Sequence, residues 1–117
     1  MNDPFLAELS AQIDDFVAER DWQQFHSPKN LAMALIVEVA ELVEHFQWLD
    51  AVESDALDEA KRAEVADELA DILIYTLRLA GRLDIDLEQA ALAKMEKNRR
   101  KYPAEKARGV ALKYNKL

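Results

Sequence analysis

Two pairs of acidic residues with helical spacing lie in the most apolar parts of the sequence. Glu38 and Glu41 form one pair, Glu68 and Asp71 form the other, and in each pair the second residue follows the first by three positions. On a helix this spacing places both carboxylates on one face, about 60° apart. Where two such faces meet in a bundle the carboxylates repel, and desolvating each costs several kcal/mol unless a proton or a cation compensates.

The chemistry of these side chains favours a hard cation. They offer only oxygen ligands, the chain has no Cys, and neither apolar stretch has the Glu-x-x-His pattern of di-iron bundles. We therefore expect Mg²⁺, with Mn²⁺ as a substitute. Mg²⁺ held by carboxylates keeps positions open for phosphate oxygens, offsets their charge and lowers the pKa of an attacking water. The pattern predicts metal-assisted cleavage of a phosphate anhydride, with all four acids as metal ligands and catalytic residues.

A simpler interpretation is that these acids belong to solvated helix faces. Glu-x-x-Glu and Glu-x-x-Asp occur on many such faces. The neighbouring Glu44, Glu64 and Asp67 fit that description. The apolar surroundings of the two pairs strengthen the metal-site interpretation, and both interpretations stay open at this point.

The first half of the chain predicts two helices. Asp3 as N-cap and Pro4 at the first helical position open a helix that ends near residue 20. An aromatic connector with Trp22 and His26 follows, and Ser27 then caps a helix to about residue 48. On this second helix the face that carries the acidic pair continues through His45 and Trp48.

The second half predicts two more helices and a tail. After a polar loop over residues 49–55, a helix runs from about residue 58 to 82, and its acidic face continues through Tyr75. Asp84 or Asp86 caps a fourth helix, which ends near Tyr102 before a basic tail over residues 103–117. These elements predict an all-α fold of the four-helix bundle type, with residues 1–117 as a single domain.

Both middle helices are apolar on all sides rather than on one face, over residues 31–46 and 72–83. A helix that is apolar all round needs cover all round, and 117 residues supply little of it. We therefore expect a homo-oligomer built on these helices. The alternative is a compact monomer in which the first helix and the tail supply the cover.

The charge of the chain is unevenly distributed. Its net charge is −8, yet residues 94–117 hold nine basic and two acidic side chains. The acidic remainder would repel a nucleic acid polymer, whereas a basic segment beside acidic residues suits a metal-bound triphosphate. A solvated basic end is the plainer interpretation. Residues 1–10 do not resemble a signal peptide, and the longest apolar run, residues 31–37, is too short for a membrane span, so we expect a cytoplasmic protein.

The same residues resemble the MazG-like all-α nucleoside triphosphate pyrophosphohydrolases. The two acidic pairs match the signature of that superfamily. Three segments are similar to its dCTP pyrophosphatase branch: RDWQQFHSPKNLAMALIVEVAELVEHFQW (20–48), DELADILIYTL (67–77) and KMEKNRRKYPAEKARGVALKY (94–114). The resemblance covers roughly residues 13–115, and its aromatic and basic segments are more specific than the acidic signature.

This resemblance implies Mg²⁺-dependent hydrolysis between the α and β phosphorus atoms, in tetramers whose active sites combine residues of neighbouring subunits. It implies that a nucleobase lies among Trp22, Trp48 and Tyr75 with His26 close by. Trp and Tyr rings can stack a base for ~1–3 kcal/mol each. The alternative is that the tryptophans only pack, that His26 caps or packs, and that Tyr75 orients Asp71.

The resemblance assigns Lys94, Asn98 and Tyr102 to the phosphate and sugar end of the substrate. Lys94 would act as a point charge, and Asn98, one turn on, would hydrogen-bond the sugar or the α-phosphate. Two positions depart from the family pattern: Ile13, where relatives of this branch can carry His, and His45, where Leu is more usual. Both bear on base selectivity and neither belongs to the metal set.

We therefore predict an enzyme of nucleotide-pool sanitation that converts dCTP or a modified dCTP to the monophosphate and pyrophosphate. Its partners are the nucleotide and further copies of the chain in a homotetramer, with no nucleic acid polymer and no membrane. The alternatives are a dUTP or broader dNTP pyrophosphatase, a di-iron carboxylate bundle, and a non-catalytic helical interaction module.

Overall fold

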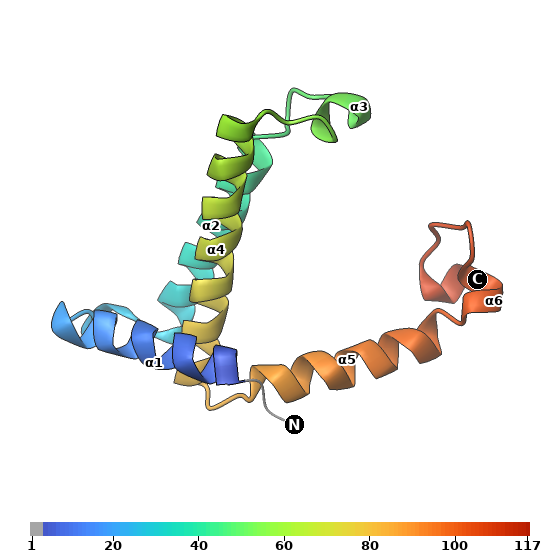
Figure 1. Ribbon diagram of the computed structural model, residues 1–117. Coiled ribbons are helices and arrows are strands. Elements are labelled where there is room, and N and C mark those ends of the chain that lie inside the picture. Colours follow the sequence, from blue (N-terminus) through green and yellow to red (C-terminus); the bar gives the residue numbers. More distant parts are fainter. Residues whose placement is uncertain (1–3) are drawn as a thin grey trace. The chain divides into compact units, whose positions relative to one another are not determined.

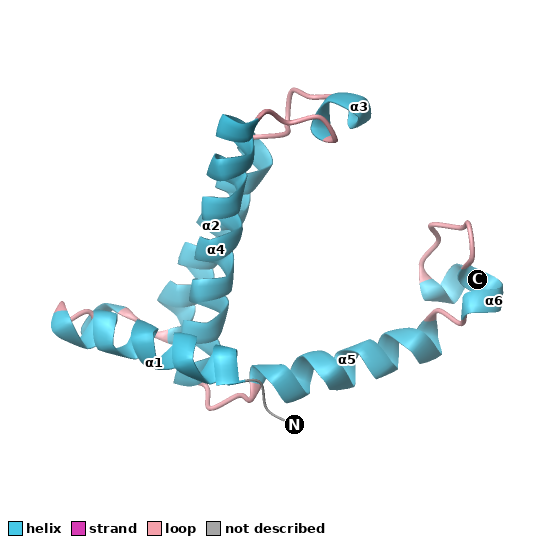
Figure 2. Cartoon of the chain, viewed as in Figure 1, coloured by secondary structure: helices cyan, strands magenta, loops and turns pink. Residues whose placement is uncertain are grey.

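The computed structural model describes residues 4–117, and these residues form helices joined by short loops (Figures 1 and 2). Within this range no strand occurs, so the all-α prediction is confirmed. The elements in chain order are α1 (Pro4–Glu19), the 3-10 turn η1 (Gln23–Phe25), α2 (Pro28–Glu44), α3 (Ala51–Ser54), α4 (Glu59–Arg82), α5 (Leu87–Lys101), α6 (Ala104–Ala107) and the 3-10 turn η2 (Tyr114–Lys116).

α2, α4 and α5 each begin directly after a residue whose side chain caps the helix N-terminus. The Ser27 hydroxyl accepts from the backbone N–H of Asn30, and the Asp58 carboxylate accepts from that of Lys61. Each bond satisfies a backbone donor that has no partner inside the helix. Asp86, and not Asp84, caps α5. The proposed cap at Asp3 lies outside the described residues.

Two helix ends depend on aspartates in an unusual backbone conformation. Asp21 and Asp84 both have φ of 54°, the left-handed region in which Gly is the common choice. Beyond each, the next N–H reaches back five residues, from Trp22 to Val17 O at 3.0 Å and from Ile85 to Ala80 O at 2.8 Å. This closure ends α1 and α4 without a glycine.

Two boundary predictions were wrong. α2 ends at Glu44 rather than near residue 48. After Glu44 the backbone winds more tightly than an α-helix, because the N–H groups of His45 and Phe46 bond to carbonyls three residues back. The expected loop over residues 49–55 contains α3, which a reciprocal capping box begins. In it the Asp50 side chain accepts from Glu53 N–H, and the Glu53 side chain accepts from Asp50 N–H.

The described chain divides into two compact units, one ending at Ile85 and the other spanning Asp86–Leu117. In the first, α2 and α4 lie side by side and antiparallel, and α1 packs on α4 (Figure 1). Their buried side chains are Ile13, Val17, Leu31, Leu77 and Ala80. The expectation of a single domain over residues 1–117 stays a prediction.

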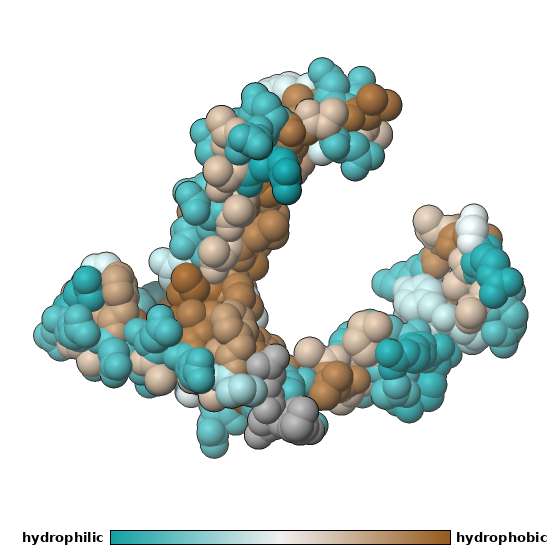
Figure 3. Space-filling model, viewed as in Figure 1, coloured by the Kyte–Doolittle hydropathy of each residue, from teal (hydrophilic) through white to brown (hydrophobic). Residues whose placement is uncertain are grey.

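Many apolar side chains of α2 and α4 are exposed on this chain. Ile36 is 68% exposed, and Met33, Val37, Val43 and Leu69 are each more than half exposed. Brown, hydrophobic atoms gather along these two helices in Figure 3. The pattern agrees with helices that are apolar all round.

The second unit consists of α5, α6 and η2. In it the rings of Tyr102 and Tyr114 meet edge to face with centroids 6.2 Å apart, and the Lys101 ammonium lies 4.9 Å from the Tyr114 ring. Within residues 103–117 the helical segments are the short α6 and η2. None of the helices over residues 4–117 is both long and apolar enough to cross a membrane.

Candidate active site

Three of the four predicted metal ligands converge between α2 and α4. Ligand oxygens of Glu38, Glu41 and Glu68 all lie within 4.8 Å of one another. Because the two helices are antiparallel, the middle of α2 faces the middle of α4, and the two acidic stripes meet there. The sequence predicts that two acidic pairs face one another, and three of their four members meet here. We call these three residues, Glu38, Glu41 and Glu68, the carboxylate cluster.

Burial and neighbouring charges oppose the ionisation of Glu38 and Glu68. Burial, followed by the charge and hydrogen bonding of Glu41 and the charges of Asp71 and Glu68, raises the pKa of Glu38 from 4.5 to about 7. The pKa of Glu68 is also raised, first by burial and then by Glu41. One carboxylate oxygen of Glu38 and one of Glu68 are buried without a hydrogen-bond partner. Such orphaned oxygens mark a place where a cation would lower the free energy.

Asp71, the fourth predicted ligand, lies next to the carboxylate cluster but outside the 4.8 Å group. It follows Glu68 by three positions on α4, and its charge contributes to the raised pKa values of Glu38 and Tyr75. Asp71 also lines an adjoining pocket. Its role as a metal ligand stays a prediction.

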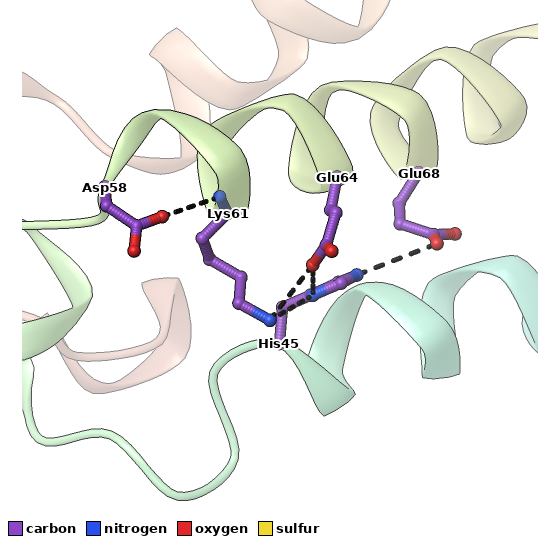
Figure 4. A network of polar contacts seen from close by, with 5 residues as sticks. All are labelled: His45, Asp58, Lys61, Glu64 and Glu68. Atoms are coloured by element: carbon purple, nitrogen blue, oxygen red, sulfur yellow. Dashed lines mark hydrogen bonds and ion pairs between the residues drawn. The ribbon is translucent and has the colours of Figure 1, made fainter.

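His45 joins the cluster to the polar start of α4 (Figure 4). Its Nε2 lies 3.7 Å from Glu68 Oε1, and its Nδ1 lies 3.6 Å from Glu64 Oε2. The Lys61 ammonium lies 3.0 Å from the same Glu64 oxygen. Glu64 is thus paired with a cation at the surface, whereas the 19% exposed Glu68 side chain lies between the more distant imidazole of His45 and the carboxylate of Glu41.

A pocket of about 410 Å³ lies between α1, the aromatic connector and α4. Trp22, His26 and Tyr75, three of the residues predicted for base binding, line it together with Asp71. The Trp22 and His26 rings are 6.4 Å apart and tilted by 53°. Ile13, one of the two departures from the family pattern, also lines this pocket, which we call the aromatic pocket.

Trp48 lies elsewhere. It is 86% exposed and lines a separate hollow of about 510 Å³ with His45, Leu57 and Lys61, at the α4 N-terminal end. Within one chain it is therefore not grouped with Trp22 and Tyr75, because α2 ends before it and the following turns redirect it. Its contribution to a base pocket stays a prediction.

The residues predicted for the phosphate end lie in the second unit. Lys94 and Asn98 are one turn apart on α5, and Tyr102 follows the last helical residue, with its N–H bonded to Asn98 O at 2.8 Å. Asn98 is half-buried and Lys94 is exposed. Their functional roles stay predictions.

Sequence reasoning missed Arg78, which lines the aromatic pocket. Its Nε donates to His26 Nδ1 at 3.2 Å, and its NH1 lies 3.1 Å from Asp14 Oδ1. The signal was present, since Arg78 follows Tyr75 by three positions and extends the same helical stripe.

Comparisons with known proteins identify the family of this chain. A model of the MazG-like family matches residues 33–117. The chain is 48% identical over 118 residues to dCTP pyrophosphatase 1 of Bos taurus, covering 99% of this chain and 70% of the relative. It is 45% identical over 117 residues to dCTP pyrophosphatase 1 of Homo sapiens, covering 98% and 69%.

A solved structure is similar as well. The crystal structure of a pyrophosphatase from Archaeoglobus fulgidus aligns with a TM-score of 0.81 and 41% sequence identity, over 88% of this chain and 96% of that chain. The length of the family match and the identity to its curated relatives lead to one conclusion: this chain belongs to the MazG-like family.

Proposed function

We propose that this chain is a nucleotide pyrophosphohydrolase that converts dCTP to dCMP and pyrophosphate with Mg²⁺. The observation that carries the proposal is the carboxylate cluster, in which three acids converge within 4.8 Å and two buried oxygens lack partners. Relatives that cover nearly the whole chain are dCTP pyrophosphatases, which supports the choice of substrate.

Glu38, Glu41 and Glu68, with Asp71 beside them, are the residues that would hold the metal. All four offer carboxylate oxygens, the donors that Mg²⁺ and Mn²⁺ prefer. When bound, Mg²⁺ would offset the charge of the triphosphate and make a water more acidic. The protein's part is to keep the carboxylates in fixed positions on two packed helices, so that the phosphates are oriented as they bind.

The aromatic pocket supports binding of the nucleoside. It is lined by Asp71, so a nucleoside held there would place its phosphates toward the carboxylate cluster. Trp22 and Tyr75 offer ring faces for stacking, and His26 offers a polar edge. Lys94, Asn98 and Tyr102 would bind the phosphate and sugar end.

We propose that the enzyme is a homotetramer with active sites shared between subunits. The exposed apolar side chains of α2 and α4, such as Ile36 and Val37, support this, because few monomers leave so much apolar surface uncovered. Trp48, 86% exposed on its own chain, would then reach a neighbour's pocket. Light scattering should give about four times 13.4 kDa; a monomer at micromolar concentration would contradict the shared site.

The cellular role that fits this activity is sanitation of the nucleotide pool in the cytoplasm. The experiment that tests the proposed function is a panel of all dNTPs and NTPs with Mg²⁺, assayed for monophosphate and pyrophosphate. The highest kcat/KM should be for dCTP or a modified dCTP. Equal hydrolysis of all dNTPs would indicate a broader dNTP pyrophosphatase. Preference for dUTP would indicate a dUTP pyrophosphatase. Absence of any hydrolysis would favour an interaction module.

A further inference from the structure

Two arginines on successive turns of α4 both reach His26, but they bind different parts of it. Arg78 Nε donates to the ring nitrogen Nδ1 at 3.2 Å. Arg82 Nε donates to the His26 backbone carbonyl at 2.9 Å. The first bond therefore acts on the imidazole, and the second acts only on the main chain.

The bond from Arg78 determines which ring nitrogen carries the proton. A guanidinium stays protonated and has no acceptor, so Nδ1 must be the acceptor and must lack a proton. Burial, then the charges of Arg78 and Arg82, lowers the pKa of His26, so the ring is neutral near pH 7. A neutral ring whose Nδ1 is bare carries its single proton on Nε2.

Arg78 is itself held in place. Its side chain is 11% exposed, and it is paired with Asp14 at 3.1 Å on the neighbouring helix α1. His26 Nε2 has no hydrogen-bond partner among residues 4–117, and His26 and Arg78 line the aromatic pocket together with Trp22 and Tyr75. The pocket therefore combines ring faces for stacking with an imidazole whose proton position Arg78 fixes.

We propose that Arg78 is a positioning residue for base selectivity: it fixes His26 in the Nε2–H tautomer, and this donor binds the unprotonated N3 of cytosine. The inference rests on the proposed function for its substrate. Cytosine N3 is an acceptor, whereas uracil and thymine carry a proton on N3. A fixed donor would meet a second donor there, and neither would be satisfied. Only the proton on Nε2 produces this discrimination, and a bare Nε2 would favour uracil.

The test compares two matched variants, Arg78→Met and Arg82→Met. Each keeps an apolar stem on α4 and removes one bond to His26. The measured quantity is kcat/KM for dCTP divided by kcat/KM for dUTP. Arg78→Met should lower this ratio roughly tenfold, mainly through KM for dCTP, and Arg82→Met should leave it near the wild-type value. An unchanged ratio in Arg78→Met, or an equal fall in both variants, would overturn the proposal.

Variants of the histidine give an independent check. His26→Gln places an amide nitrogen near the position of Nε2 and should keep much of the preference for dCTP. His26→Asn places its amide nearer to Nδ1 and should lose the preference. If Asn preserved the ratio better than Gln, the donor would not be at Nε2.

The tautomer is measurable without catalysis, which separates this inference from the proposed function. Long-range ¹H–¹⁵N correlation spectra of the full chain at pH 7 should show a protonated Nε2 and a bare Nδ1 for His26. In Arg78→Met the two tautomers should mix. A protonated Nδ1 in the wild type would refute the inference even if dCTP is hydrolysed. Failure to hydrolyse either nucleotide would refute the proposed function and the proposed hydrogen bond from His26 to cytosine N3. The spectrum would still determine which tautomer His26 adopts.

Discussion

The acidic residues at the helix starts and those between α2 and α4 have opposite surroundings. Asp50, Asp58 and Asp86 each accept a backbone N–H at 2.8 to 3.1 Å and lie at the surface. Glu38 and Glu68 instead lie beside other carboxylates, and each has one buried oxygen without a partner. The first group stabilises the helix to which it belongs, whereas the second group destabilises the chain until protons or cations compensate.

This contrast separates acids that build the fold from acids that are kept for chemistry. A carboxylate that already accepts a hydrogen bond from the backbone has little to gain from a metal ion. A carboxylate with a raised pKa and an orphaned oxygen gains much more. Removing an acid from each group should therefore have different consequences for activity and for stability.

The largest effect should come from the carboxylate cluster and the adjacent Asp71. Replacing Glu38, Glu41, Glu68 or Asp71 with Ala should lower kcat by at least ~10²-fold, because the metal loses a ligand. Thermal unfolding of the metal-free variants should stay cooperative, since each change removes one of several repelling charges. The matched control is Glu64→Ala, whose carboxylate is paired with Lys61. Retained activity in two or more of the four variants would contradict the assignment.

Changes in the aromatic pocket should affect binding more than chemistry. Trp22→Ala removes a stacking surface and should raise KM for dCTP roughly 5- to 150-fold, with a smaller fall in kcat. Trp48→Ala should do the same if a neighbouring subunit completes the pocket. Steady-state kinetics on dCTP and dTTP provide the measurement. Wild-type KM and base preference in both variants would mean that these tryptophans only pack.

A capping acid should matter for stability alone. Asp58→Ala removes the acceptor for Lys61 N–H and should lower the free energy of unfolding by about 1 kcal/mol. Asp58→Asn, which retains a capping oxygen, should lose much less. Urea denaturation measures both, and kcat should be nearly unchanged in each. A large loss of kcat in Asp58→Asn would place this residue among the functional acids instead.

The metal-free protein should also show a pH-dependent stability. The pKa of Glu38 is about 7 in the folded state against an ordinary 4.5, so the folded state holds a proton that the unfolded state releases. Its contribution to stability is complete below pH 4.5 and is lost as the pH rises through about 7. In EDTA the wild-type Tm should therefore fall over this range by more than that of Glu38→Gln, which lacks the ionising group. Parallel curves for the two proteins would contradict the raised pKa.

Much of this contrast could be predicted from the sequence, because both groups of acids have local signatures. The caps at Ser27 and Asp58 precede helical periodicity directly, and the spacing of the acidic pairs fixes a shared face. The capping box of α3 had a signal as well, Asp50 followed three residues later by Glu53, but it lay in a segment interpreted as a loop.

The remaining features depend on tertiary structure. Asp21 and Asp84 end helices in a conformation usually marked by Gly, so no local pattern predicted it. Arg78 meets His26 only because α4 packs against the segment before α2. Trp48 was expected on the acidic face, but α2 ends four residues earlier. Helical periodicity predicts a face only as far as the helix continues.

The central claim, that the carboxylate cluster with the adjacent Asp71 binds a divalent cation and the capping and surface acids do not, is tested most directly by calorimetric titration of Mg²⁺ without nucleotide. Wild type and Glu64→Gln should bind with similar Kd, whereas Glu38→Gln and Glu68→Gln should bind at least tenfold more weakly, a loss of about 1.4 kcal/mol or more. Equal affinity in all four proteins would show that the cation binds elsewhere and would contradict the account.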